Sequence, residues 1–233
     1  MTTVLLLGPL GTTADVWADT ARLLSPRHQP RAVDVPLGGA DCTDLDRFAD
    51  TLLALVPDRG QAVVVGVGFG ACLALAVALR EPATVAGLVL AAGTACPSDP
   101  AAWLDRAARV RASGLGDLAP AIAERWDVPA DQADRTLAML AGVDAAAYAD
   151  CCELASTIDL RPRLPEVACP ALVVRAGADR ALPADHTTDL VAGLRLVDEV
   201  VLARAGHLAM LAPELAHLVL AFAEELGEPV TPA

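Results

Sequence analysis

The sequence lacks lysine, so all 17 of its basic residues are arginine, against 30 aspartate and glutamate residues. We interpret this absence as a coding bias rather than as part of a mechanism. The formal net charge is −13 at pH 7, and no cluster of arginines offsets the acidic balance. Phosphate backbones and anionic membranes are repelled by such a surface, so we expect neither nucleic acid nor a membrane as a partner. The composition favours a small-molecule substrate.

Apolar runs long enough to span a membrane are also missing, and the first residues lack the charged stretch that begins a signal peptide. We therefore expect a reducing, cytoplasmic environment. The six cysteines form no C-x-x-C pair with a second pair or a histidine partner, which argues against a zinc site. The adjacent Cys151 and Cys152 are interpreted as small buried apolar residues. No metal, nucleotide or flavin signature is present, and no cofactor is predicted. The sequence gives no indication of oligomeric state.

No linker rich in proline, glycine or serine divides the 233 residues, so one domain with an insertion is expected. Apolar strand signals alternate with helical ones, which predicts an α/β fold with a mostly parallel sheet covered by helices on both faces. A helix is predicted at 46–56 and another at 214–226. The predicted strands are residues 4–7, 31–35, 61–66, 85–91, 171–175 and 199–202.

The stretch 96–163 breaks this alternation because it is rich in alanine and helical throughout. We predict that it is a helical lid, and that residues 1–95 and 164–233 form the core. An insertion after the fourth strand would cover the carboxyl ends of the strands, where open α/β sheets bind ligands.

One short motif has the form of a strand-to-helix turn that carries a nucleophile in many enzymes. The pentapeptide Gly66-Val67-Gly68-Phe69-Gly70 follows a β-branched run and precedes a helix-compatible stretch. Its spacing matches G-x-S-x-G rather than the G-x-G-x-x-G of a dinucleotide loop, yet glycine stands at the centre. Glycines on both sides allow the helix to pack close to the turn. Gly68 cannot attack a carbonyl, and Cys72 is expected to point into the packed helix.

An acid and a histidine follow two late strands in the order that completes this motif. Asp179 comes directly after the predicted strand at 171–175, and His207 follows the strand at 199–202. Nucleophile turn, acid and histidine is the chain order of the α/β-hydrolase fold, so the sequence resembles that superfamily over nearly its whole length. A lone histidine after a strand is often a surface residue, but its register with Asp179 favours a place in the active-site pocket.

Within this superfamily the sequence is most similar to 3-oxoadipate enol-lactonases. The matching pieces are Pro9-Leu10-Gly11-Thr12-Thr13, Trp17, Arg125-Trp126, Tyr148-Ala149-Asp150-Cys151-Cys152, Ile158-Asp159-Leu160, Gly177, Asp179 and Pro183. The resemblance implies a hydrolase core with a lid and a small carbonyl or lactone substrate. The sequence departs from the family at two points, since relatives commonly carry serine where Gly68 stands and many have His-Gly where this chain has Gly8-Pro9.

Two backbone donors are expected to form an oxyanion hole. Pro9 has no N–H, but such holes usually take the N–H of the next residue, here Leu10, and of the residue after the nucleophile, here Phe69. Without a serine side chain, we expect room above Gly68 for a water molecule or a substrate hydroxyl. His207, held by Asp179, would then act as a general base.

The lid supplies the candidates for substrate contacts, and each has a second interpretation. Trp103, Trp126 and Tyr148 either line the pocket or form the core of the lid. Arg125 either pairs with a substrate carboxylate, as the resemblance suggests, or is a solvated charge on the lid.

Three hypotheses for function remain open. The first is an enzyme that uses His207 and Asp179 for elimination, cyclisation, isomerisation or water attack without a covalent intermediate, in specialised metabolism. The second is a ligand-binding protein on a catalytically dead scaffold. The third is a serine hydrolase disabled by the replacement of its nucleophile. We favour the first, because a scaffold without activity has no need to retain both members of the dyad and the oxyanion framework.

Overall fold

The computed structural model describes residues 1–38, 42–57, 61–97, 99–182 and 184–227. Pro183, one of the residues quoted above, lies outside this part of the chain. Six strands of the described residues form one sheet in the order β2-β1-β3-β4-β5-β6, and each neighbouring pair is parallel. The strands are β1 (Thr3–Leu7), β2 (Gln29–Val33), β3 (Ala62–Val67), β4 (Val85–Ala91), β5 (Ala171–Ala176) and β6 (Val197–Leu202). The predicted parallel α/β sheet is confirmed.

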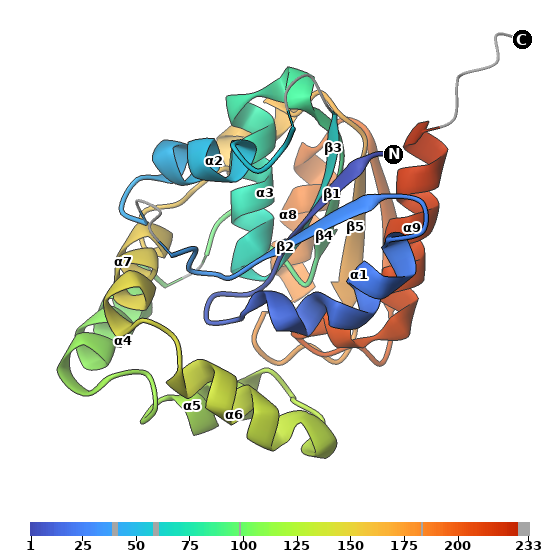
Figure 1. Cartoon of the computed structure of the whole chain (residues 1–233). Coiled ribbons are helices and arrows are strands. Elements are labelled where there is room, and N and C mark those ends of the chain that lie inside the picture. The colour runs from blue at the N-terminus through green and yellow to red at the C-terminus, as the bar shows by residue number, and fades with distance from the viewer. Residues whose placement is uncertain (39–41, 58–60, 98, 183, 228–233) are drawn as a thin grey trace, which may run out of the picture.

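Helices cover both faces of this sheet, as predicted. In the core they are α1 (Ala18–Leu24), α2 (Leu45–Leu53), α3 (Phe69–Arg80), α8 (Ala184–Gly193) and α9 (Pro213–Gly227). Helices α1 and α9 contact each other on one face, whereas α2 and α3 pack together on the other, where α8 also lies (Figure 1). The central strands β1 and β3 are buried along their whole length. Their continuous apolar sequences are those of strands covered on both sides.

Two strands differ from the predictions by two residues: β2 is shifted at both ends, beginning at Gln29 rather than at 31, and β6 begins earlier than predicted. β2 ends at Val33 rather than at 35, because Val35 turns away to form an isolated antiparallel bridge with Thr12 in the loop after β1. β6 begins at Val197 rather than at 199. Asp198 and Glu199, near the start of this edge strand, are exposed and charged, so the apolar pattern that predicts a strand begins only after them.

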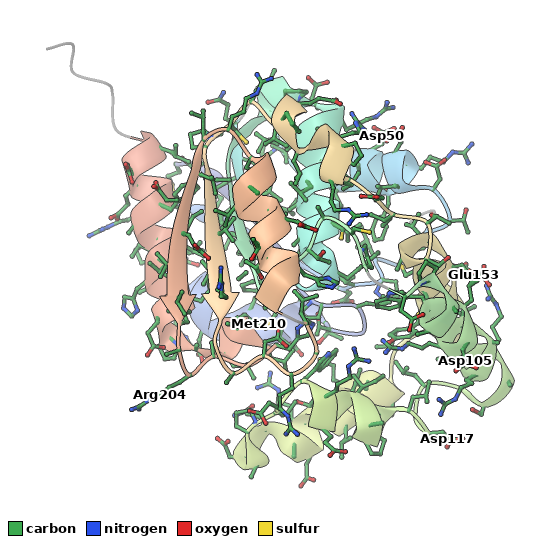
Figure 2. The ribbon with its side chains drawn as sticks, turned by 180° about the vertical axis from the view of Figure 1, so that it is seen from behind. Asp50, Asp105, Asp117, Glu153, Arg204 and Met210 are labelled. Atoms are coloured by element: carbon green, nitrogen blue, oxygen red, sulfur yellow. The ribbon has the colours of Figure 1, made fainter. Side chains whose placement is uncertain are left out.

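The helices between β4 and β5 gather at one end of the molecule, apart from the sheet (Figure 1). They are α4 (Pro100–Ser113), α5 (Ala119–Arg125), α6 (Ala133–Ala141) and α7 (Ala145–Ala155). Seen from behind, Asp105 and Glu153 lie on this group, far from Asp50 on the core (Figure 2). All four helices fall within the predicted lid, whose exact boundaries stay a prediction. We refer to α4–α7 as the lid. None of the described helices is long and apolar enough to cross a membrane.

Candidate active site

The turn between β3 and α3 is a tight strand-to-helix connection centred on Gly68. This residue has φ +59° and ψ −123°, a conformation that glycine adopts at little cost and other residues adopt under strain. Its flanking glycines are sterically required. A Cβ on Gly66 would lie 2.3 Å from the carbonyl oxygen of Gly70, and a Cβ on Gly70 would lie 2.4 Å from that of Leu7. The chain forms the predicted elbow, and glycine is required on both sides of Gly68 because no larger residue fits there.

Asp179 and His207 come together at the carboxyl ends of β5 and β6. The Nδ1 of His207 lies 2.9 Å from Oδ2 of Asp179. The other carboxylate oxygen, Oδ1, accepts hydrogen bonds from the backbone N–H groups of Ala181 at 2.7 Å and Leu182 at 3.1 Å. Because an ionised carboxylate only accepts hydrogen bonds, Nδ1 carries the proton, and Nε2 is the nitrogen left for chemistry.

The imidazole of His207 faces Gly68 at close range. A Cβ built on Gly68 would lie 2.8 Å from Nε2 of His207 and 3.2 Å from Cβ of Pro9. The point that a Cβ of residue 68 would occupy is therefore crowded by the imidazole and by Pro9. Gly68 and His207 nevertheless line the same cavity, so room beside Gly68 for a water molecule or a substrate hydroxyl stays a prediction.

The two residues predicted to form an oxyanion hole, Leu10 and Phe69, lie beside one cavity. Leu10 follows β1, Phe69 is the first residue of α3, and both line the same cavity as His207. Within the described part of the chain, neither backbone N–H donates to a protein acceptor. The N–H of Phe69 belongs to the first turn of the helix, where donors have no partner within the helix and the potential is positive. An oxyanion hole formed by these two groups stays a prediction.

The cavity lies between the carboxyl ends of the strands and the lid, and its volume is about 470 Å³. This is the position at which open parallel sheets bind ligands. The residues from the core are Pro9, Leu10, Gly68, Phe69, Thr94, Pro97, Ala181, Leu182 and His207. The residues from the lid and the loops beside it are Asp99, Ala102, Trp103, Asp105, Arg106, Arg109, Leu118, Ala121, Ile122, Arg125 and Trp126.

Three of the predicted lid residues line this cavity. The Trp126 ring stacks on the His207 ring, with centroids 6.1 Å apart and an angle of 29° between the planes. Arg125 donates from Nη2 to the carbonyl oxygen of Ala181 at 3.1 Å. Trp103 lies beneath the guanidinium of Arg106, whose Cζ is 4.7 Å from the ring centroid. The end of α5 therefore contacts both loops that carry the dyad.

Tyr148 is the exception, since it lies behind the wall of the cavity. Its side chain is 1% exposed and is not among the lining residues. α7 presses it against the loop after β1, where a Cβ on Gly11 would lie 3.1 Å from the Tyr148 ring. Burial raises the pKa of Tyr148 to about 12, and the nearby Arg106 guanidinium opposes that rise. Of the two interpretations of Tyr148, its position agrees with lid core, because the side chain is buried in the packing of the lid and does not line the cavity.

Sequence reasoning missed several lining residues. Thr94 and Pro97 follow β4 in a loop that carries no motif. Arg106 lies one helical turn after Trp103, a spacing that places the two side chains on one face of α4 and was the available signal. Cys72 is fully buried, as predicted, and its thiol donates to the carbonyl of Thr94 at 3.0 Å. Burial raises the pKa of this thiol, so it is no replacement nucleophile.

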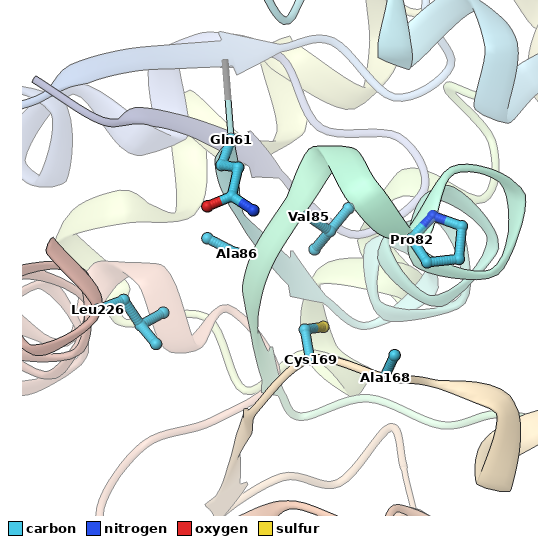
Figure 3. A pocket seen from close by; sticks show the side chains of 7 residues that line it. All are labelled: Gln61, Pro82, Val85, Ala86, Ala168, Cys169 and Leu226. Carbon is cyan, nitrogen blue, oxygen red and sulfur yellow. The ribbon is translucent and has the colours of Figure 1, made fainter. Parts of the chain in front are cut away.

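A smaller hollow of about 210 Å³ lies at the amino ends of β3 and β4 (Figure 3). It is lined by Gln61, Pro82, Val85, Ala86, Ala168, Cys169 and Leu226. Among the described residues that line it, the one titratable side chain is the thiol of Cys169, whose pKa burial raises to about 11. These lining residues include no acid–base pair, so the hollow is not the candidate site. Among the residues with described positions, no group of three or more His, Cys, Asp or Glu side chains is placed to hold a metal.

Comparison with known proteins gives concordant results. Residues 4–216 match the model of the Alpha/beta hydrolase family. The chain is 27% identical over 205 residues to 3-oxoadipate enol-lactonase 2 of Acinetobacter baylyi, an alignment that covers 82% of this chain and 74% of the relative. For 3-oxoadipate enol-lactonase 1 of the same organism the identity is 25% over 182 residues, covering 73% and 68%.

Solved structures extend this likeness to the fold. The enol-lactonase from Burkholderia xenovorans superposes with a TM-score of 0.87 at 23% identity, covering 96% of this chain and 91% of that one. A thermophilic esterase from Thermogutta terrifontis gives a TM-score of 0.89 at 22% identity, covering 98% and 91%. At these identities the two structures establish a shared fold alone.

Proposed function

Since the chain belongs to the Alpha/beta hydrolase family, we propose that it is an enzyme in which His207 and Asp179 perform general acid–base chemistry without a covalent nucleophile. The observation that supports this proposal is the close approach of the base to the centre of the elbow, where residue 68 has no side chain. Nε2 of His207 lies 2.8 Å from the point where a Cβ of residue 68 would stand. We propose that Gly68 occupies the nucleophile position, so that the base acts directly on what enters the cavity.

The proposed substrate is a small carbonyl or lactone compound, in keeping with the enol-lactonases named among the relatives. Nε2 removes a proton from a substrate hydroxyl, from a carbon next to the carbonyl or from a water molecule. The imidazole holds the proton as a cation that Asp179 stabilises through Nδ1–H, and then returns it to the leaving group or to the product, which restores neutral His207. Elimination, cyclisation, isomerisation and water attack all begin with this step.

Negative charge then develops on the carbonyl oxygen, which we place against the backbone N–H groups of Leu10 and Phe69. General base catalysis contributes about 10²–10⁴-fold, and an oxyanion donor about 10²–10³-fold in kcat. Together these effects are sufficient for an activated carbonyl or lactone and insufficient for an unactivated amide. In this proposal Trp103, Trp126 and Arg125 contact the substrate from the lid.

The test is a product-detected screen of enol-lactones, p-nitrophenyl esters and β-keto carbonyl compounds. The native chain is compared with His207→Ala, and we expect turnover that the substitution abolishes. A silent native chain that binds a ligand one to one without turnover would instead favour the dead scaffold.

Two substitutions at position 68 separate the proposal from a disabled serine hydrolase. Gly68→Ala and Gly68→Ser add the same Cβ, which displaces His207, and they differ by one oxygen atom. We expect both to lower the native activity. If Gly68→Ser alone gives rapid ester hydrolysis with a burst of the first product, and the native chain is inactive, the noncovalent mechanism is refuted.

A further inference from the structure

Asp127, just after α5, departs from the usual pattern of helix termination. Its φ is +54°, in the left-handed region where glycine is usual and aspartate is tolerated. The N–H of Asp127 donates to the carbonyl of Glu124 at 3.1 Å, and the N–H of Val128 donates to that of Ala123 at 3.3 Å. These two bonds form a Schellman motif, whose left-handed position is most often glycine. Aspartate therefore stands where glycine would end the helix with less strain.

The side chain of Asp127 reaches the loop that carries the acid of the dyad. Its Oδ1 lies 3.5 Å from Nη1 of Arg180, the residue after Asp179. Both side chains are largely exposed, 64% for Arg180 and 48% for Asp127. Such an exposed ion pair contributes little to the free energy of folding. What it adds is a contact between the lid and the acid loop, which glycine could not make.

The same corner of the lid packs on the loop that carries the base. A Cβ on Gly206, the residue before His207, would lie 3.0 Å from the carbonyl oxygen of Trp126 and 3.5 Å from Cβ of Asp127. The Trp126 ring stacks on the imidazole itself. Asp127 is not among the described residues that line the cavity, so it reaches the chemistry only through Trp126 and the two loops.

We propose that Asp127 is a positioning residue for the base. Its left-handed backbone ends α5 so that Trp126 lies on His207, and its carboxylate holds this corner against Arg180. Loss of the carboxylate lets the Trp126 ring shift on the imidazole, which then adopts orientations other than the one that directs Nε2 at the cavity. This inference rests on the proposed function, since it takes His207 as the base.

Asp127→Gly separates positioning from support of the fold. Glycine adopts the same φ without strain, so a residue that only supports the fold would be replaced at no cost. We expect the urea midpoint of unfolding to equal that of the native chain or to rise. On the substrate found in the screen, kcat should fall about 2- to 5-fold while KM changes less than about twofold, because a misdirected base slows the chemical step.

Asp127→Asn tests the carboxylate alone, because asparagine tolerates the left-handed backbone and has nearly the same shape. We expect the same fall in kcat from Asp127→Asn and from Arg180→Gln, and no further fall when the two are combined. Asp131→Asn is the matched control. This exposed carboxylate lies between α5 and α6, 3.4 Å from Nε2 of Gln132, and its loss should leave kcat unchanged.

A readout that needs no turnover is the proton NMR signal of Hε1 on His207, identified by its absence in His207→Ala. The ring current of Trp126 displaces this signal, and Trp126→Leu gives its position without the stack. We expect Asp127→Asn and Asp127→Gly to move the signal toward that position, and Asp131→Asn to leave it in place.

The inference is overturned if both Asp127 variants keep the native kcat and the native Hε1 signal, or if the urea midpoint falls in Asp127→Gly in step with activity. Losses that add when Asp127→Asn and Arg180→Gln are combined would also overturn it, because the two residues would then act separately. Turnover that requires His207 but does not respond to Asp127 would remove this inference and leave the proposed function standing. A displaced signal in a chain without turnover would do the reverse.

Discussion

The core and the lid place their functional groups by different means. In the core, backbone lies against backbone, and a Cβ on Gly70 or Gly177 would come within 2.4 Å and 2.8 Å of main-chain atoms. In the lid, side chains make the contacts: Arg125 reaches a carbonyl, and Trp126 stacks on the imidazole of His207. Where main chain packs against main chain, almost no residue other than glycine fits. A residue that makes only a side-chain contact can be replaced without displacing the main chain.

This difference indicates which part of the site is fixed by the fold and which part sets selectivity. The elbow, Asp179 and His207 lie on loops that directly follow β3, β5 and β6, so their geometry depends on the whole sheet. The arginines and tryptophans that line the cavity lie on α4 and at the end of α5. We expect changes in the core to act on stability and changes in the lid to act on binding and turnover.

The largest effect is expected at Gly70. In Gly70→Ala the new Cβ would lie 2.4 Å from the carbonyl oxygen of Leu7 and 2.7 Å from that of Gly8. Main-chain atoms cannot move aside cheaply, so the free energy of unfolding should fall by about 3 kcal/mol or more, as measured by urea denaturation. Gly116→Ala in the lid is the control, because nothing lies within 4 Å of its Cβ. A change there above about 0.5 kcal/mol would contradict the comparison.

A smaller effect, on catalysis, is expected at Trp126. Trp126→Leu removes the ring that stacks on His207, and aromatic pairs are worth about 0.5–1.5 kcal/mol beyond their buried area. On the substrate found in the screen, kcat should fall about 3- to 10-fold, with an altered pH profile, whereas Trp126→Phe should be closer to the native chain.

Trp103→Leu provides the lid control for that prediction. This tryptophan lines the same cavity but lies under Arg106 instead of His207. We expect a higher KM and an unchanged pH profile of kcat. An equal loss of kcat in both leucine variants would mean that the Trp126 stack does not orient the base.

The third expected effect is on the free energy of unfolding at acidic pH, and it comes from His28 in the core. His28 is 6% exposed, and neither ring nitrogen has a hydrogen-bond partner among the described residues. Burial lowers its pKa below the ordinary value of 6.5, although Glu224 opposes this shift. The unfolded chain therefore takes up this proton at higher pH than the folded chain does. Stability due to neutral His28 is complete above about pH 6.5 and is lost as the pH falls below it.

His28→Phe should remove this part of the pH dependence, as seen in unfolding free energies at about pH 7.5 and pH 5. His217→Gln is the control, because that exposed ring already has a partner in the carbonyl of Pro213 at 2.8 Å. The prediction fails if the free energy of unfolding changes with pH to the same extent in the native chain and in His28→Phe.

Much of the fold could be predicted because its signals are local. The buried strands are continuous β-branched runs, and the elbow is marked by the glycines that no larger residue can replace. The pairing of Asp179 with His207 followed from chain order, because both residues come at strand ends on the same edge of a parallel sheet.

The parts that could not be predicted depend on packing between distant segments. The room above Gly68 is set by a histidine 139 positions away in the chain, and the place of Tyr148 is set by how α7 meets the loop after β1. The position of Arg106 over Trp103 follows from helical spacing, whereas the stacking of Trp126 on His207 could be seen only in three dimensions.

One amide group connects the lid to the acid of the dyad. The carbonyl of Ala181 accepts from Arg125, and the N–H of the same peptide unit, carried by Leu182, donates to Asp179. A cation on the oxygen of an amide polarises it and strengthens the hydrogen bond given by its nitrogen. An anionic ligand that draws Arg125 away withdraws this polarisation. We therefore expect occupancy of the cavity by an anion to be coupled to the hydrogen bonding of Asp179 across a single peptide plane, with no movement of the backbone required.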